Sequence, residues 1–201
     1  VVRNTRGCTG FVGPASKPVP LSAEEVEKMG VENVSLMLKP DEINREVLQQ
    51  QKEKLARFGM TISDAACNEL QKNKSIHLNL PDRDFQIERF NNMLRVLGEE
   101  KIPFTSIAWQ PNGILRTDHR VGQHTRGGNS AFCDQAEILA RPNAESRAYT
   151  EEEIWENFAY FMEKVVPVAE QTGFASAAHF RRVFREMMGV GPLQYRKSSR
   201  G

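Results

Sequence analysis

The stretch FQIERFNNMLRVLGEEKIPFTSIAW, residues 85–109, contains the two patterns that decide the fold. In its first part, apolar residues recur every three or four positions, as they do along the buried side of an amphipathic helix; they are Ile87, Phe90, Leu94 and Leu97. Gly98 ends this pattern, as glycine often does after a helix. The short run IPFTSIAW (102–109) then has the composition of a buried strand. The stretch predicts a helix followed by a strand.

Two more strands are predicted on the N-terminal side. They are the runs VENVSLML (31–38) and MTISDAAC (60–67), which are short and rich in apolar residues. Between them, residues 41–59 predict a helix with an apolar stripe of Ile43, Val47, Leu48, Leu55 and Phe58. The polar segment NELQKNKSIHLNLPDRD (68–84) is expected to be a loop.

Two capping boxes mark further helices. Ser22 and Glu25 open a short helix that ends before Gly30. Thr150 and Glu153 open a long acidic helix that runs toward residue 173, in which Pro167 is expected to cause a kink or to start a new helix.

The alternation of strands and helices predicts an α/β fold with a parallel sheet built from βαβ units. A doubly wound sheet and a TIM barrel both have this order. No G-x-G-x-x-G follows the first strand, which disfavours a dinucleotide-binding sheet. A complete barrel has eight units in about 250 residues, whereas only the three strand runs quoted above precede the long acidic helix. The interpretation is a partial TIM barrel.

Composition excludes several classes of protein. Hydrophobic residues make up 39% and charged residues 26% of the 201 residues, as in ordinary globular proteins. No apolar run reaches the roughly 20 residues of a membrane helix, so no membrane association is expected. The first 20 residues have no signal-peptide layout. Cys8, Cys67 and Cys133 are too widely spaced for a disulfide framework or a zinc site, which predicts reduced thiols and a cytoplasmic location.

The long segment from 110 to 148 carries candidate binding residues. Arginine guanidinium groups can bind a carboxylate bidentately, and Gly127 and Gly128 let a backbone approach closely; the candidates here are Arg116, Arg120, His124 and Arg126. A solvated connector is the alternative. Other polar residues are ambiguous too. Asp64, Cys67 and Glu69 could face a barrel mouth or simply cap a strand end, and His77, His119 and His124 lack the spacing of a metal cluster, which indicates ordinary surface or hydrogen-bonded histidines.

Four stretches together resemble the mannonate dehydratase family: GVENVSLML, LPDRDFQIERFNNMLRVLGEEKIPFTSIAWQPNGILRT, TRGGNSAFCD and YTEEEIWENFAYFMEKVVPVAEQTG. This resemblance covers roughly residues 20–173. It implies a xylose-isomerase-like TIM barrel that dehydrates D-mannonate to 2-dehydro-3-deoxy-D-gluconate with a divalent metal, manganese or iron. It also implies a sugar-acid partner in hexuronate catabolism, with Trp109, Asn112, Arg116 and Arg126 nearest the substrate.

The same resemblance sets a limit on activity. In that family the metal ligands, a Cys, two His and an Asp, come from a later part of the barrel, after a strand and a segment of the HP.DPP type. This chain has no matching segment, so no metal ligands are assigned and no catalysis is expected of the chain alone.

The charge of the chain changes sign near its C-terminus. Residues 145–170 contain seven acidic and two basic side chains, whereas residues 179–201 contain six basic and one acidic. The stretch VAEQTGFASAAHFRRVFREMMGVGPLQYRK (168–197) resembles the second helix-turn-helix of the AraC/XylS regulators. A first helix over 167–172, a turn at Gly173 and a second helix over 177–188 are expected. The second helix has a predicted apolar stripe of Phe180, Val183, Phe184 and Met187.

The residues of this motif that are predicted to contact DNA are Ser176, His179, Arg181, Arg182 and Arg185. A surface helix with a basic side is the alternative. Because only one of the two units of such regulators is present, weak binding to duplex DNA is expected. The predicted organisation is an irregular segment over 1–20, a partial barrel over 21–173 and a helix-turn-helix segment over 168–201. The open edge of a partial sheet is also expected to favour self-association.

Overall fold

The computed structural model describes residue 28, residues 30–122 and 127–174, and residues 185, 190 and 191. The predicted irregular segment over 1–20 and nearly all of the predicted helix over 21–30, including its Ser22–Glu25 box, lie outside these residues, as does most of the predicted helix-turn-helix. No helix of the described part is long and apolar enough to cross a membrane.

Two of the predicted strands form a parallel pair. β1 (Asn33–Met37) and β2 (Thr61–Ala66) are joined by the short helix η1 (Pro40–Glu42) and by α2 (Arg45–Ala56), which is a βαβ unit as expected. The side chain of Asn44 caps α2 by accepting a hydrogen bond from the backbone N–H of Val47 at 2.9 Å. The register shifts between Val34 and Ser35, so that Leu36 lies beside Ala65.

The prediction of a third regular strand over 102–109 is wrong. This segment runs beside β2, where the N–H of Ala65 donates to the carbonyl of Phe104 at 3.1 Å, but it forms no strand ladder. Pro103 has no N–H to donate, which weakens a ladder at its start. The buried side chain of Gln71 instead holds the segment, because its Nε2 donates to the carbonyl and to the Oγ of Ser106, both at 2.6 Å.

The segment 68–84, which was expected to be a loop, begins with two short helices. These are α3 (Asn68–Gln71) and α4 (Lys74–His77), and the side chain of Asn73 caps the second by accepting from the N–H of Ile76. Helices of four residues are too short for an apolar repeat to reveal them. Both pack against the core through Leu70 and Ile76.

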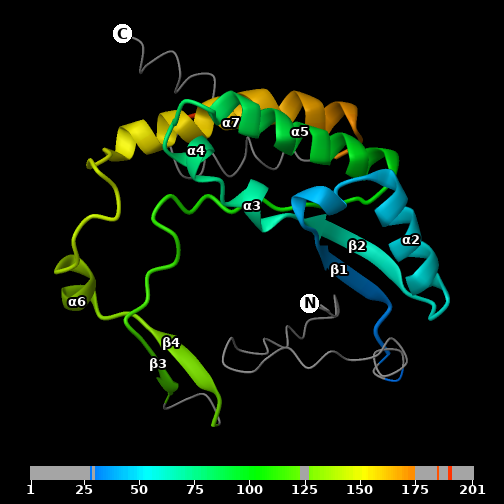
Figure 1. Cartoon of the computed structure of the whole chain (residues 1–201), viewed down its shortest axis with the longest axis horizontal. Helices are drawn as coiled ribbons and strands as arrows, with labels where there is room; N and C mark the ends of the chain where they lie inside the picture. The colour runs from blue at the N-terminus through cyan, green and yellow to red at the C-terminus, as the bar shows by residue number, and fades with distance from the viewer. Residues whose placement is uncertain (1–27, 29, 123–126, 175–184, 186–189, 192–201) are drawn as a thin grey trace.

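The predicted helix of the opening stretch is confirmed as α5 (Arg83–Glu99), and all four residues of its predicted stripe are buried. The long acidic helix is confirmed as α7 (Glu151–Gln171), with the capping box of Thr150 and Glu153 in place. α5 and α7 lie side by side along one side of the molecule (Figure 1). The rings of Phe90 and Phe161 meet edge to face there, with centroids 5.2 Å apart.

One of the two alternatives predicted for Pro167, the start of a new helix, is wrong. α7 continues through Pro167 to Gln171 with Thr172 as its C-cap, so the predicted short helix over 167–172 is the end of this long helix and not a separate element. The apolar side of α7 explains this continuity, because Val165 and Ala169, on either side of Pro167, are both buried in the core.

The segment 110–148 is more regular than a connecting loop. It contains an antiparallel hairpin of β3 (Asp118–Val121) and β4 (Asn129–Phe132), followed by α6 (Gln135–Leu139), which Asp134 caps. The hairpin and α6 lie away from the helical layer (Figure 1). An ion pair between Lys74 Nζ and Glu145 Oε2, 2.7 Å apart, ties the segment back to α4.

A buried carboxylate joins α2 to the end of α5. Glu100 is 5% exposed, and its two oxygens lie 3.1 Å from Arg45 Nε and 2.8 Å from Lys52 Nζ. The hydrogen bond from Lys52 is the main reason why the pKa of Glu100 lies below its usual value. This carboxylate therefore contributes to stability above its ordinary pKa, and that contribution is lost as the pH falls.

Gly98 allows close contact between α5 and the end of α7. A Cβ atom at this position would lie 2.6 Å from the backbone oxygen of Thr172. We expect Gly98→Ala to lower the free energy of unfolding by about 1–3 kcal/mol, because the backbone would have to move. This loss should outweigh the roughly 1 kcal/mol by which alanine favours a helix over glycine. Urea denaturation measures it; Glu99→Ala, at an exposed neighbouring position, is the control, and an unchanged midpoint for Gly98→Ala would contradict the close approach.

Candidate functional site

The segment 102–109 ends in an aromatic cluster between α4 and α7. The ring of Trp109 lies 4.4 Å from that of His77, 4.9 Å from that of Phe158 and 6.0 Å from that of Phe161, measured between centroids. Trp155 extends the cluster along α7, with its ring 5.9 Å from that of Phe158. The first role of Trp109 is therefore to hold the end of the segment against the helices.

This cluster lies beyond the carboxyl end of β2. Phe104 contacts β2 itself, whereas Ser106 contacts α3, which follows β2 in the chain. The segment therefore runs in the same direction as β2, and Trp109 lies past the strand end. In parallel α/β proteins this is the side on which ligands bind.

Some polar atoms in this region have no partner among the described residues. They are buried, and they include the Nε1 of Trp109 and the Oε1 of Gln110 as well as the Oγ1 of Thr105. A buried donor or acceptor without a partner costs about 1–3 kcal/mol. Water or a hydroxyl-rich ligand would satisfy an indole N–H and an amide oxygen.

His77 also belongs to this region. The sequence predicts an ordinary surface or hydrogen-bonded histidine here, and it does not indicate how deeply the residue is buried. It is 3% exposed, and the Nδ2 of Asn157 on α7 donates to its carbonyl at 3.0 Å. Burial lowers the pKa of His77 to about 4, against the smaller opposite effect of a hydrogen bond to the backbone of Gln71. The apolar neighbours Ile76 and Leu78 were the available sequence signal for burial.

The other predicted substrate residues are more exposed. Asn112 lies in the turn after the segment, and Arg116 precedes β3, with its carbonyl accepting from Arg141 Nη1 at 2.9 Å. Arg126 lies outside the described residues. Of the remaining candidates, Arg120 is exposed on β3 and lies 3.7 Å from Asp118, and His124 is also outside the described residues. Trp109, Asn112 and Arg116 thus follow one another along the chain, with Trp109 against the helices and the other two exposed.

The candidates at the end of β2 do not form one site. Asp64 accepts hydrogen bonds from Ser35 at 2.5 Å and from Ser63 at 3.1 Å. Cys67 is fully buried in the core, and Glu69 is exposed. Within the described part of the chain, no group of three or more His, Cys, Asp or Glu side chains could hold a metal ion. These residues therefore do not fit the divalent metal that the resemblance implies.

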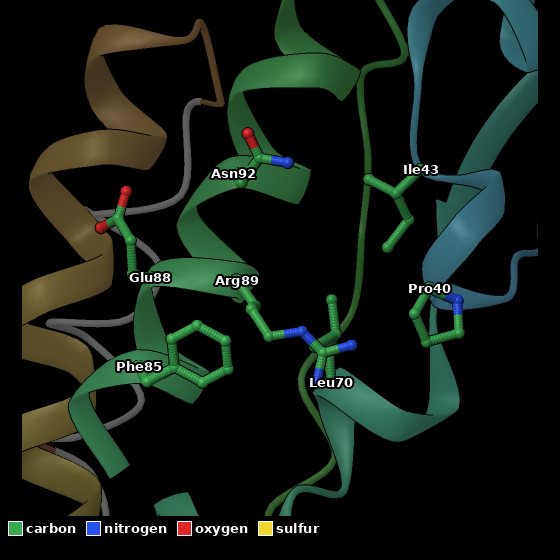
Figure 2. Close-up of a pocket in the computed structure, with 7 residues that line it drawn as sticks. All are labelled: Pro40, Ile43, Leu70, Phe85, Glu88, Arg89 and Asn92. Carbon is green, nitrogen blue, oxygen red and sulfur yellow. The ribbon is translucent and has the colours of Figure 1, made fainter. Parts of the chain in front are cut away.

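A surface groove of about 330 Å³ lies elsewhere, between η1, α3 and α5. Figure 2 shows the side chain of Arg89 extending along it toward Leu70, with Phe85 on the same helix. The full lining is Pro40, Ile43, Leu70, Phe85, Glu88, Arg89 and Asn92. None of the predicted substrate residues lines this groove.

Comparison with known proteins finds relatives of this chain by sequence. The chain is 29% identical over 160 residues to a mannonate dehydratase of Streptococcus agalactiae serotype Ia, and 26% identical over 164 residues to that of Shouchella clausii. The chain carries a mannonate dehydratase-like segment. These matches cover 68% and 67% of the chain but 45% of each relative, so the chain spans less than half the length of the relatives it matches.

A solved structure shares the fold of the mannonate dehydratase-like segment. The crystal structure of mannonate dehydratase from Streptococcus suis serotype 2 superposes with a TM-score of 0.61 at 20% identity. The superposition covers 77% of this chain and 48% of that protein. The described sheet is accordingly part of such an α/β fold, and it is not closed.

The C-terminal resemblance is also confirmed. Residues 164–197 match the family described as bacterial regulatory helix-turn-helix proteins, AraC family. Of the residues predicted to contact DNA, Arg185 is exposed, whereas Ser176, His179, Arg181 and Arg182 lie outside the described residues.

The burial of His77 predicts a pH dependence of stability. The unfolded chain takes up a proton at this residue near pH 6.5, whereas the folded chain resists it down to about pH 4. The free energy of unfolding should therefore fall as the pH is lowered from 7 to 5, by about 2 kcal/mol from this residue. Urea denaturation at several pH values measures this decrease above the range in which carboxylates titrate.

Two variants distinguish the contribution of His77 to this pH dependence from the contributions of other titratable groups. His77→Phe keeps a ring beside Trp109 and should flatten the dependence between pH 7 and 5, even if it lowers stability throughout. His119→Gln, at an exposed position on β3, should leave it unchanged. An equal slope in His77→Phe and the wild type would show that His77 is not held neutral by burial.

Proposed function

We propose that the mannonate dehydratase-like segment binds a sugar acid at the end of the segment 102–109. The observation that carries this proposal is the buried indole N–H of Trp109, which has no partner among the described residues, next to the equally unsatisfied amide oxygen of Gln110. Both lie on the side of β2 where ligands of parallel α/β proteins bind. The relatives named mannonate dehydratase supply the class of ligand.

The chemistry of a sugar acid suits these groups. Its hydroxyls can accept from the indole and donate to the amide oxygen. Its carboxylate requires a cation, and the exposed guanidinium of Arg116 follows a few residues later in the chain. Asn112 and Arg126 complete the proposed set of substrate residues.

Binding without turnover is the proposed behaviour of this chain. A divalent manganese or iron ion in the family supplies Lewis-acid chemistry for the removal of water. The described residues offer no group of side chains that could hold such an ion. The dehydration itself would need a set of metal ligands, which the described residues do not provide.

The chain with D-mannonate and excess Mn²⁺ is expected to form no 2-dehydro-3-deoxy-D-gluconate. Chromatographic assay of the product over a range of metal concentrations measures this. A complete mannonate dehydratase assayed in parallel is the positive control. Product formation that rises with bound metal would show that the chain holds ligands outside the described residues.

Binding is tested by calorimetric titration with D-mannonate. Trp109→Phe keeps an aromatic ring in the cluster but removes the N–H, and it should weaken binding about five- to tenfold, the equivalent of one hydrogen bond of roughly 1–1.4 kcal/mol. Trp155→Phe is the matched control, because the indole of Trp155 already donates to Glu151 at 3.2 Å. Equal affinities in the two variants, with equal melting temperatures, would contradict the role of Trp109.

A second function, binding to duplex DNA, is favoured by the match of residues 164–197 to the AraC helix-turn-helix family. We propose that Ser176, His179, Arg181, Arg182 and Arg185 meet the DNA. Arginines can reach phosphates, which fix position, or base edges, which give specificity. A single unit makes few phosphate contacts, so the binding should be weak and strongly dependent on salt.

Titration of labelled duplexes at several salt concentrations tests this second function. Replacement of Arg181, Arg182 and Arg185 by Ala should weaken binding on all sequences and make the salt dependence shallower, if the contacts are to phosphate. Loss of a base contact should instead cost about 1–3 kcal/mol on a preferred site only. Replacement of Lys54, Arg57 and Lys72 by Ala removes equal charge at exposed positions elsewhere and should have little effect. No binding by the wild type at low salt would exclude the function.

A further inference from the structure

The surface groove between η1, α3 and α5 lies at the carboxyl ends of both strands of the described parallel sheet, because η1 follows β1 and α3 follows β2. Ligands of open α/β sheets bind at that end. The volume of about 330 Å³ is near the lower limit of the roughly 300–1,000 Å³ that ligand pockets have, which suits a small molecule better than a protein segment. None of the lining residues belongs to the aromatic cluster around Trp109, so the groove is a separate place in the fold.

Helix α5 presents to the groove a side that it does not use for packing in the core. Phe85, Arg89 and Asn92 are four and three residues apart, which places them along one side of the helix. The stripe that α5 buries, from Ile87 to Leu97, is a different side. Phe85 is 66% exposed, so most of its ring is available to another molecule.

The facing wall of the groove is apolar. It consists of Pro40 and Ile43 around η1 and of Leu70 on α3. Figure 2 shows the guanidinium of Arg89 among these side chains, with the ring of Phe85 on its other side. Hydrocarbon atoms of a ligand gain free energy against such a wall, whereas hydroxyl groups that are buried there without a partner lose it. The wall therefore disfavours a hydroxyl-rich sugar acid.

The groove carries a positive charge that the described residues do not neutralise. Arg89 is half-buried and donates from Nη1 to Gln86 Oε1 at 2.9 Å, but within the described part of the chain it forms no ion pair with a carboxylate. Glu88 also lines the groove, yet its Oε1 pairs with Arg95 Nη1 at 2.6 Å, and its carboxylate points away from Arg89 in Figure 2. A guanidinium with open N–H groups can hold a carboxylate bidentately, and the amide of Asn92 can donate to the same group.

We propose that this groove binds a small aromatic carboxylate. The carboxylate pairs with Arg89 and accepts from Asn92, while the ring packs between Phe85 and the apolar wall of Pro40 and Ile43. Aromatic rings meet edge to face or with an offset, which the exposed ring of Phe85 allows. The inference depends neither on sugar-acid binding at Trp109 nor on DNA binding.

Calorimetric titration of the full chain with phenylacetate tests the proposal. Phenylacetamide has the same ring without the charge, and acetate has the charge without the ring; each should bind about tenfold more weakly or worse. Arg89→Gln should weaken phenylacetate binding about tenfold, and Phe85→Ala about threefold or more. Arg57→Gln is the matched control, because it removes one exposed guanidinium at the end of α2, away from the groove, and should leave the affinity unchanged.

Two further arms make the outcome decisive. Arg89→Lys keeps the charge but not the planar fork, so its affinity should lie between those of the wild type and Arg89→Gln, at a melting temperature near that of the wild type. Saturating D-mannonate, or Trp109→Phe, should leave phenylacetate binding unchanged, which distinguishes this groove from the proposed sugar-acid site. Absence of phenylacetate binding, equal binding of phenylacetamide or acetate, equal affinity in Arg89→Gln, or displacement by D-mannonate would each overturn the proposal.

Discussion

The structure depends on the burial of one helix, α5, between the sheet and α7. Phe90, Leu94 and Leu97 are buried in the core that this helix shares with the sheet and α7, and full burial of each contributes about 1.5–3 kcal/mol. Gly98 lets the end of α7 approach the backbone of α5. Without this helix both the two-stranded sheet and α7 would lose a large part of their apolar contacts, and a two-stranded sheet is marginal by itself.

The same packing explains the candidate site. α4 and α7 are held against α5, and together they form the wall on which Trp109 rests. This packing also buries polar groups. They are a neutral His77 and the indole N–H of Trp109, which has no partner among the described residues. Such groups reduce stability, and their position at a strand end is the basis of the proposal that a ligand binds here.

The two resemblances overlap within α7. The helix-turn-helix match begins at residue 164, inside this helix, yet Val165, Ala169 and the following Phe174 are buried in the core of the barrel-like part. The first helix of the matched motif is therefore already committed to that core. Any DNA-binding unit here would have to share its first helix with the barrel fragment, which gives one reason to expect weak binding.

The sequence by itself determined the elements whose apolar pattern is long enough to read. The stripe from Ile87 to Leu97 and the box of Thr150 and Glu153 located α5 and α7, and two apolar runs located β1 and β2. The sequence also showed the resemblances to the mannonate dehydratase family and to the AraC helix-turn-helix family. Tertiary structure alone decided that segment 102–109 is held by Gln71 instead of a strand ladder, and that His77 is buried beside Trp109. These depend on contacts between residues about 35 positions apart, which no local periodicity encodes.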